Sequence, residues 1–175
     1  PHPALAGSGA PGTGWAAGGG RVCGHTAVPS PGPITHVGLD TPASLVAGPD
    51  ANTWYVNGTG SIGKVTPLGA VTNYYDSRIR TPISIVARGS VLWFTDSDAD
   101  AIFKVTTSGA ITMYPLAVGN YAGPYDLAVG PDNNLWFTAG NEIGRFNPGS
   151  LQLDRYTNPA GYAAQIVASP TDSAL

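Results

Sequence analysis

One short sequence pattern occurs three times in this chain at nearly constant spacing. It is a strand-like run around a Trp, followed a few residues later by a second apolar run, and a Gly-Pro-Asp turn precedes two of the copies. The tryptophans are Trp54, Trp93 and Trp136, which are 39 and 43 residues apart. A period near forty, with several short apolar runs in each period, is typical of an array of small β units.

Each copy divides into four short runs of β-forming residues. The full repeats span 41–80, 81–122 and 123–162. Four antiparallel strands repeated at about forty residues are typical of a β-propeller blade, and no segment has the apolar period of a helix. The sequence therefore predicts an all-β fold, a β-propeller built of four-stranded antiparallel blades of ~40 residues. The expected strands are 44–47, 53–57, 62–66 and 70–75, then 84–88, 91–96, 101–106 and 110–114, then 126–130, 134–139, 142–147 and 151–156.

Turn residues agree with these strand boundaries. Pro42, Pro82 and Pro124 are expected to open the first strand of each blade, where a missing N–H costs little. Asp50 and Asp132 follow Pro in the turn between the first two strands, and Asp and Asn are common turn formers. These positions indicate short strands joined by tight hairpins.

Large aromatic residues recur in the second strand of each blade. They are Trp54, Trp93, Phe94, Trp136 and Phe137. Burying such a ring is worth roughly 1.5–3 kcal/mol, so the rings are best interpreted as packing between neighbouring blades rather than as a ligand cage.

The two ends of the chain are interpreted differently from the repeats. Residues 1–32 are rich in Gly and Pro and are expected to be a flexible segment, whereas 33–175 form the propeller repeats. An alternating run at 34–39 resembles the last strand of a blade, and the partial repeat 163–175 begins like a first strand. Either the two ends combine into a composite fourth blade, or the sequence is an excerpt of a longer propeller. Self-association of two copies could also complete a ring.

Composition excludes several classes of partner. Only 11% of the residues are charged, the net charge is -3, and eight Lys and Arg are scattered singly, so no nucleic-acid groove is expected. No apolar run approaches the ~20 residues of a membrane span, so no membrane partner is expected. The low charge favours an extracellular or cell-envelope protein.

The sequence of the repeat resembles that of a known family. Residues 130–138 read Gly-Pro-Asp-Asn-Asn-Leu-Trp-Phe-Thr and residues 142–146 read Glu-Ile-Gly-Arg-Phe. This is similar to the streptogramin lyase (virginiamycin B lyase) family and to other NHL-like propellers, over residues 33 to about 169. The resemblance implies a seven-bladed propeller that opens a cyclic depsipeptide antibiotic by elimination at an ester. In such a reaction a base removes the proton α to a carbonyl while Mg²⁺ polarises the oxygen.

The family's implied catalytic residues are histidines and a glutamate near the channel mouth. No histidine lies within 41–175, so no histidine base can be placed on these blades. The acidic position that often ends the family's Trp-Phe-Thr strand holds Asn57, Asp96 and Ala139 here. We therefore expect no complete catalytic set in these residues and name no catalytic residue.

Candidate binding residues lie in loops on one face around the propeller channel, where function usually resides. The face includes the loops between second and third strands and the connections between blades. The candidates are Asn57, Asp96, Asp98, Asp100, Asn141, Glu142, Tyr121, Tyr125, Asp126, Arg78 and Arg80.

Three groups of these candidates suggest particular chemistry. Asp96, Asp98 and Asp100 alternate, which suggests a weak metal site, although a solvated hairpin tip is the simpler interpretation. Arg78 and Arg80 could bind an anion bidentately. Asp126 replaces Ser44 and Ser84 of the other repeats at the start of the innermost strand, where Tyr121 and Tyr125 could add aromatic contacts.

The sequence thus predicts a propeller module that binds a small molecule, a glycan or a protein on its loop face, without a complete catalytic set and with no certain cofactor. The alternative is part of a Mg²⁺-dependent streptogramin B lyase, a carbon–oxygen lyase that cleaves a cyclic depsipeptide ester by elimination.

Overall fold

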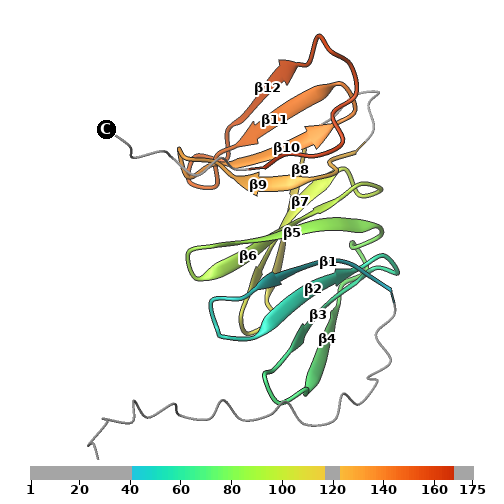
Figure 1. Ribbon diagram of the computed structural model, residues 1–175, viewed down its shortest axis with the longest axis vertical. Helices are drawn as coiled ribbons and strands as arrows, with labels where there is room; N and C mark the ends of the chain where they lie inside the picture. Colours follow the sequence, from blue (N-terminus) through green and yellow to red (C-terminus); the bar gives the residue numbers. More distant parts are fainter. Residues whose placement is uncertain (1–40, 117–122, 168–175) are drawn as a thin grey trace, which may run out of the picture. The chain divides into compact units, whose positions relative to one another are not determined.

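The computed structural model describes residues 41–116 and 123–167, which form three four-stranded antiparallel sheets (Figure 1). These residues belong to one unit, Gly32–Leu175. Four features of the sequence lie outside the described residues: the segment 1–32, the run at 34–39, Tyr121 and the end of the partial repeat. The described part of the chain contains no helix that could span a membrane.

Within each sheet the strands follow one another in sequence order. The first sheet contains β1 (Pro42–Ala47), β2 (Thr53–Asn57), β3 (Ser61–Val65) and β4 (Val71–Tyr75). The second contains β5 (Pro82–Arg88), β6 (Val91–Asp96), β7 (Ala101–Thr106) and β8 (Ile111–Pro115). The third contains β9 (Leu127–Val129), β10 (Leu135–Ala139), β11 (Glu142–Phe146) and β12 (Leu153–Thr157). The predicted all-β propeller architecture is confirmed.

The third sheet differs most from the predicted boundaries. β9 has only three residues and begins at Leu127, so Pro124 precedes the strand instead of opening it as predicted. β12 begins two residues later than predicted because Leu151 has a positive φ of 59° and lies in the turn, where its N–H donates to the carbonyl of Asn147 (2.8 Å). A positive φ interrupts the extended backbone that a strand requires.

Apolar side chains pack between consecutive sheets. Trp54 and Ile62 of the first sheet form one buried cluster with Phe94 and Phe103 of the second. A second cluster lies one sheet further along and joins Trp93 and Ile102 of the second sheet with Leu127 and Phe137 of the third. The prediction that these aromatic rings pack between blades is confirmed for Trp54, Trp93, Phe94 and Phe137.

Trp136 is the exception among the predicted core rings. Every sheet carries a Trp–Tyr pair at van der Waals contact, and the ring centroids lie 5.5 Å, 5.4 Å and 5.8 Å apart in Trp54–Tyr74, Trp93–Tyr114 and Trp136–Tyr156. Trp136 is only half-buried, and Tyr156 is 47% exposed. No sheet within the described ranges covers this pair, so the prediction that Trp136 is an inter-blade core residue was wrong for these residues.

Turn residues also determine how the tryptophans hydrogen-bond. The indole N–H of Trp54 donates to Asp50 (2.9 Å) and that of Trp136 donates to Asp132 (3.0 Å). The corresponding turn of the second sheet is shorter and contains no Asp, and the Trp93 Nε1 is buried without a partner among the described residues. The two Asp turns therefore stabilise the neighbouring ring as well as the hairpin.

Side chains on the innermost strands connect each sheet to the next. The Ile85 N–H donates to Ser44 Oγ (3.4 Å), and the Leu127 N–H donates to Ser84 Oγ (3.3 Å). At the third sheet the Ile166 N–H donates to Asp126 Oδ2 (2.9 Å). The Ile166 N–H is therefore bonded to the third sheet in the same way as the Leu127 N–H is bonded to the second.

The equivalent tryptophans provide a matched pair of stability tests. Trp54→Ala removes a fully buried ring between two sheets and should lower the free energy of unfolding by about 3–5 kcal/mol. Trp136→Ala removes a half-buried ring and should cost roughly 1–2 kcal/mol. Urea unfolding followed by circular dichroism measures both. Equal losses would contradict the conclusion that only Trp54 is covered by a neighbouring sheet.

Candidate functional site

The loops between second and third strands contact the segments that precede the first strand or follow the fourth strand of the same sheet. In the second sheet, the Ser97 N–H donates to the Thr81 carbonyl (3.1 Å). In the third, the Ala163 N–H donates to the Gly140 carbonyl (3.0 Å). These loops and segments, 57–61, 96–101 and 139–142 with 76–81, 123–126 and 158–166, form the surface that we call the loop face.

We call residues 76–81, which join β4 to β5, the first connection. Asp96 is fully buried where this connection meets the second sheet. Its carboxylate accepts the backbone N–H groups of Arg80 (2.7 Å), Thr81 (3.1 Å) and Ala99 (2.9 Å). A buried carboxylate with three N–H donors is well compensated for its loss of hydration. Asp96 therefore joins the connection to the β6–β7 loop and is not free to bind a ligand.

The other two carboxylates of the predicted metal site do not join Asp96. Asp98 is exposed and accepts the hydroxyl of Thr81 (2.6 Å), and Asp100 is exposed with a positive φ of 45°. Within 41–116 and 123–167, no group of three His, Cys, Asp or Glu residues could hold a metal ion. The described residues therefore do not fit Mg²⁺ or Ca²⁺.

Three further candidates take part in local structure. The Asn57 Oδ1 accepts the Thr59 N–H (3.2 Å), which closes the turn after β2. Glu142 accepts the guanidinium of Arg155 (3.3 Å). The Asn141 carbonyl accepts the Asn158 N–H (2.7 Å), which ties the last connection to the β10–β11 loop.

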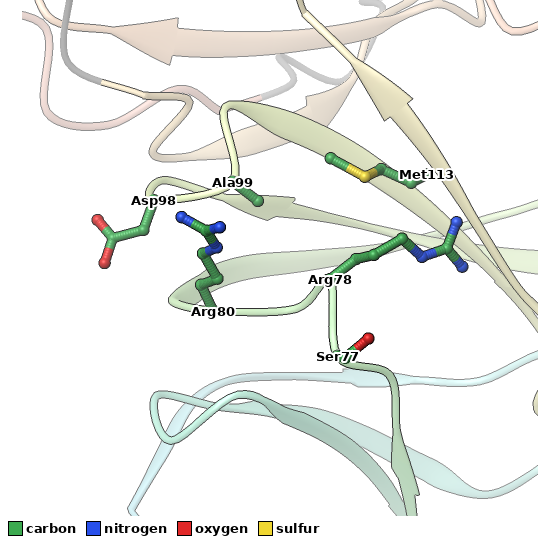
Figure 2. Close-up of a pocket in the computed structure, with 6 residues that line it drawn as sticks. All are labelled: Ser77, Arg78, Arg80, Asp98, Ala99 and Met113. Atoms are coloured by element: carbon green, nitrogen blue, oxygen red, sulfur yellow. The ribbon is translucent and has the colours of Figure 1, made fainter.

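A surface pocket of about 260 Å³ lies between the first connection and the second sheet (Figure 2). It brings together three of the sequence-predicted residues, Arg78, Arg80 and Asp98, with three that the sequence did not indicate. Its lining residues are Ser77, Arg78, Arg80, Asp98, Ala99 and Met113. Met113 comes from β8, so no local pattern could have placed it beside the arginines.

The two arginines of the pocket are in different electrostatic states. Arg78 makes two hydrogen bonds with Asp76, from Nε to Oδ1 (2.9 Å) and from Nη2 to Oδ2 (2.6 Å). The hydrogen bond from Arg78 lowers the pKa of Asp76 to about 2. The guanidinium of Arg80 has no hydrogen-bond or ion-pair partner within the described ranges. Only Arg80 therefore offers a free charge.

A second group of candidates surrounds Asp126. Its Oδ1 accepts the Ser84 hydroxyl (2.9 Å), and its Oδ2 accepts the Ile166 N–H. Beside it, Tyr125 is 39% exposed and Tyr162 is 61% exposed, with ring centroids 6.5 Å apart in an edge-to-face arrangement. Asp126 thus links consecutive sheets, whereas the rings of the two tyrosines are exposed to solvent. The Tyr125–Tyr162 contact joins two connections that are far apart in the sequence.

Loss of the carboxylate bonds at Asp96 should be costly. Asp96→Asn places an amide NH₂ against a backbone N–H and should lower the free energy of unfolding by about 2–3 kcal/mol. Asp98→Asn is the control, because loss of its one exposed hydrogen bond should lower the free energy of unfolding by less than about 1 kcal/mol. Chemical unfolding measures both variants, and a small equal loss in both would show that Asp96 does not hold the connection.

The Asp76–Arg78 pair should make stability depend on pH. The pKa of Asp76 is lowered from 3.8 to about 2, so the stabilisation is present above pH ~4 and is lost as the pH falls toward ~2. The melting temperature of Asp76→Asn should therefore lie below that of the unmodified protein at pH ~5, and the difference should shrink toward pH ~2. A difference that stays constant over this range would contradict the assignment.

Two kinds of comparison with known proteins, by family model and by structure, point to the same family. The search of curated proteins returned no match. Virginiamycin B lyase from Staphylococcus aureus matches in structure with a TM-score of 0.66 and 28% identity, over 73% of this chain and 45% of that chain. A streptogramin B lyase structure matches with a TM-score of 0.61 and 29% identity, over 67% of this chain and 41% of that one.

A catalytically inactive virginiamycin B lyase from Staphylococcus aureus with quinupristin matches with a TM-score of 0.65 and 27% identity, over 73% of this chain and 45% of that chain. The chain thus spans less than half the length of these three proteins. The model of the virginiamycin B lyase family matches residues 32–175. On this match, and on a fold and repeat that agree with it, the chain belongs to the virginiamycin B lyase family.

Proposed function

We propose that this chain is a propeller module that binds a small molecule, a glycan or a protein on its loop face. The observation that carries the proposal is the exposed pair of rings, Tyr125 and Tyr162, beside the carboxylate of Asp126. Aromatic rings with a polar end are common at binding surfaces, because the ring supplies apolar contact and the hydroxyl a hydrogen bond.

The Tyr125 ring is held on an ordered backbone. The Tyr125 N–H donates to the Thr138 carbonyl (2.7 Å), and its own carbonyl accepts the Thr95 hydroxyl (2.6 Å). Thr95 and Thr138 are both buried. A ring on a fixed backbone loses less conformational entropy on binding, which favours a ligand small enough to contact both tyrosines.

Part of a Mg²⁺-dependent streptogramin B lyase is the second candidate function. It is supported by the family match and by the 28% identity to virginiamycin B lyase. The described residues include no histidine and no group that fits the metal, so we assign no step of the elimination to them. In this candidate the chain supplies blades and ligand contacts to a reaction centre formed by other residues.

Two further features belong to the proposal. Self-association to complete a ring is supported by the partly exposed Trp136 and Tyr156, whose counterparts in the other two sheets are covered by the next sheet. An extracellular or cell-envelope location is supported by the low fraction of charged residues.

Binding can be tested by calorimetric titration with quinupristin, the antibiotic in the structure of a relative. We expect saturable binding that Tyr125→Ala and Tyr162→Ala each weaken by about tenfold, because each removes one stacking ring. Tyr75→Ala is the control, since Tyr75 is an even more exposed tyrosine (75%) on the outermost strand β4. Absence of saturable binding by the folded protein would remove the small-molecule form of the proposal for this ligand. Equal weakening by Tyr75→Ala would remove the tyrosine pair as its site.

The lyase candidate has a separate test. The chain is incubated with quinupristin and Mg²⁺, and linear product is followed by chromatography, because elimination opens the ring without changing the mass. Since the described residues supply no histidine base, we expect no product above a protein-free blank. Product from the purified, folded chain would favour the lyase over the binding module.

A further inference from the structure

We infer that the pocket between the first connection and the second sheet is a binding site for a small organic carboxylate, which Arg80 holds through its guanidinium. This site is separate from Tyr125 and Tyr162 and does not depend on the function proposed for them. Its volume, about 260 Å³, suits a molecule smaller than a typical drug.

The walls of the pocket are fixed before any ligand enters. Three backbone N–H groups bound to buried Asp96 hold the connection against the β6–β7 loop. The Thr81 hydroxyl fixes Asp98, and the Asp76 carboxylate fixes Arg78 through two hydrogen bonds. Binding therefore requires little ordering of the pocket wall and loses little conformational entropy there.

The charges of the lining leave one unmatched group. Arg78 is neutralised by Asp76. Asp98 is bound to Thr81, and in Figure 2 its carboxylate points away from Arg78 and Met113. The guanidinium of Arg80 lies between Asp98 and Ala99 in Figure 2, and it has no hydrogen-bond or ion-pair partner within the described ranges. A guanidinium has a planar set of donors that matches the two oxygens of a carboxylate.

The remaining lining selects an organic anion over an inorganic one. In Figure 2, Met113 lies on the same side of the pocket as Arg78, and Ala99 lies between Met113 and Arg80. A flexible thioether side chain accommodates apolar groups of varied shape. The ligand that fits both sides has a carboxylate for Arg80 and a short aliphatic part for Met113 and Ala99.

The test is a titration of the whole chain with 4-methylpentanoate, followed by NMR of the Arg80 Nε–H and the Met113 methyl group. We expect both signals to shift saturably with one dissociation constant. The neutral analogue 4-methylpentanamide and inorganic phosphate should each bind about tenfold more weakly or worse. The amide tests the charge, and phosphate tests the apolar part.

Two variants locate the site. Arg80→Gln should weaken 4-methylpentanoate about tenfold and leave the circular dichroism spectrum unchanged, because its side chain holds no other residue. Arg88→Gln is the control; Arg88 is bound to the carbonyl of Asn133 and lies outside the pocket lining. Binding that is unchanged in Arg80→Gln, or equal for acid and amide, would overturn the proposal. Equal affinity for phosphate would overturn its apolar part.

Discussion

The packing of one sheet's tryptophan against the next sheet is the interaction on which the rest of this structure depends. A single four-stranded sheet of this length leaves an apolar face in water and cannot bury it alone. Trp54 and Trp93 are buried because a following sheet covers them. Lys64 spans the same boundary: its ammonium lies 5.3 Å from the Trp54 ring and donates to the Thr107 carbonyl of the next sheet (3.1 Å). Stability therefore comes from pairs of sheets.

This stacking also explains why one repeated position has three different roles. The residue that ends the second strand lies where a sheet meets the connection to the next one. Asn57 closes its own turn, Asp96 binds three N–H groups of its surroundings, and Ala139 is simply buried. The carboxylate at this position in the second sheet is therefore explained by a structural need. That need accounts for Asp96 but not for the exposed Asp98 and Asp100 of the same loop.

Two parts of the loop face carry the binding sites that we propose. One is apolar and aromatic, around Tyr125 and Tyr162, and the other is cationic, around Arg80. Both are carried by connections between sheets, whose ends are held by hydrogen bonds to the β6–β7 and β10–β11 loops. A rigid scaffold with varied loops is the usual arrangement for changing ligands without changing the fold. Family membership thus gives the fold of this chain, whereas the side chains of the loops determine what it can bind.

The sequence by itself determined the period, the twelve strands to within a few residues and the aromatic positions of the core, because turn residues and strand patterns act over short distances. Only the tertiary structure decided which polar groups are satisfied. Asp96 accepts N–H groups 15 and 16 residues away, and Asp126 bonds to residues 42 and 40 positions away, so no local pattern separates these two carboxylates from exposed Asp98. Trp136 lies in the same sequence pattern as Trp54, yet it is only half-buried, because burial depends on whether a neighbouring sheet packs against the ring. Arg80 has no side-chain partner within the described ranges, whereas Arg78 pairs with Asp76.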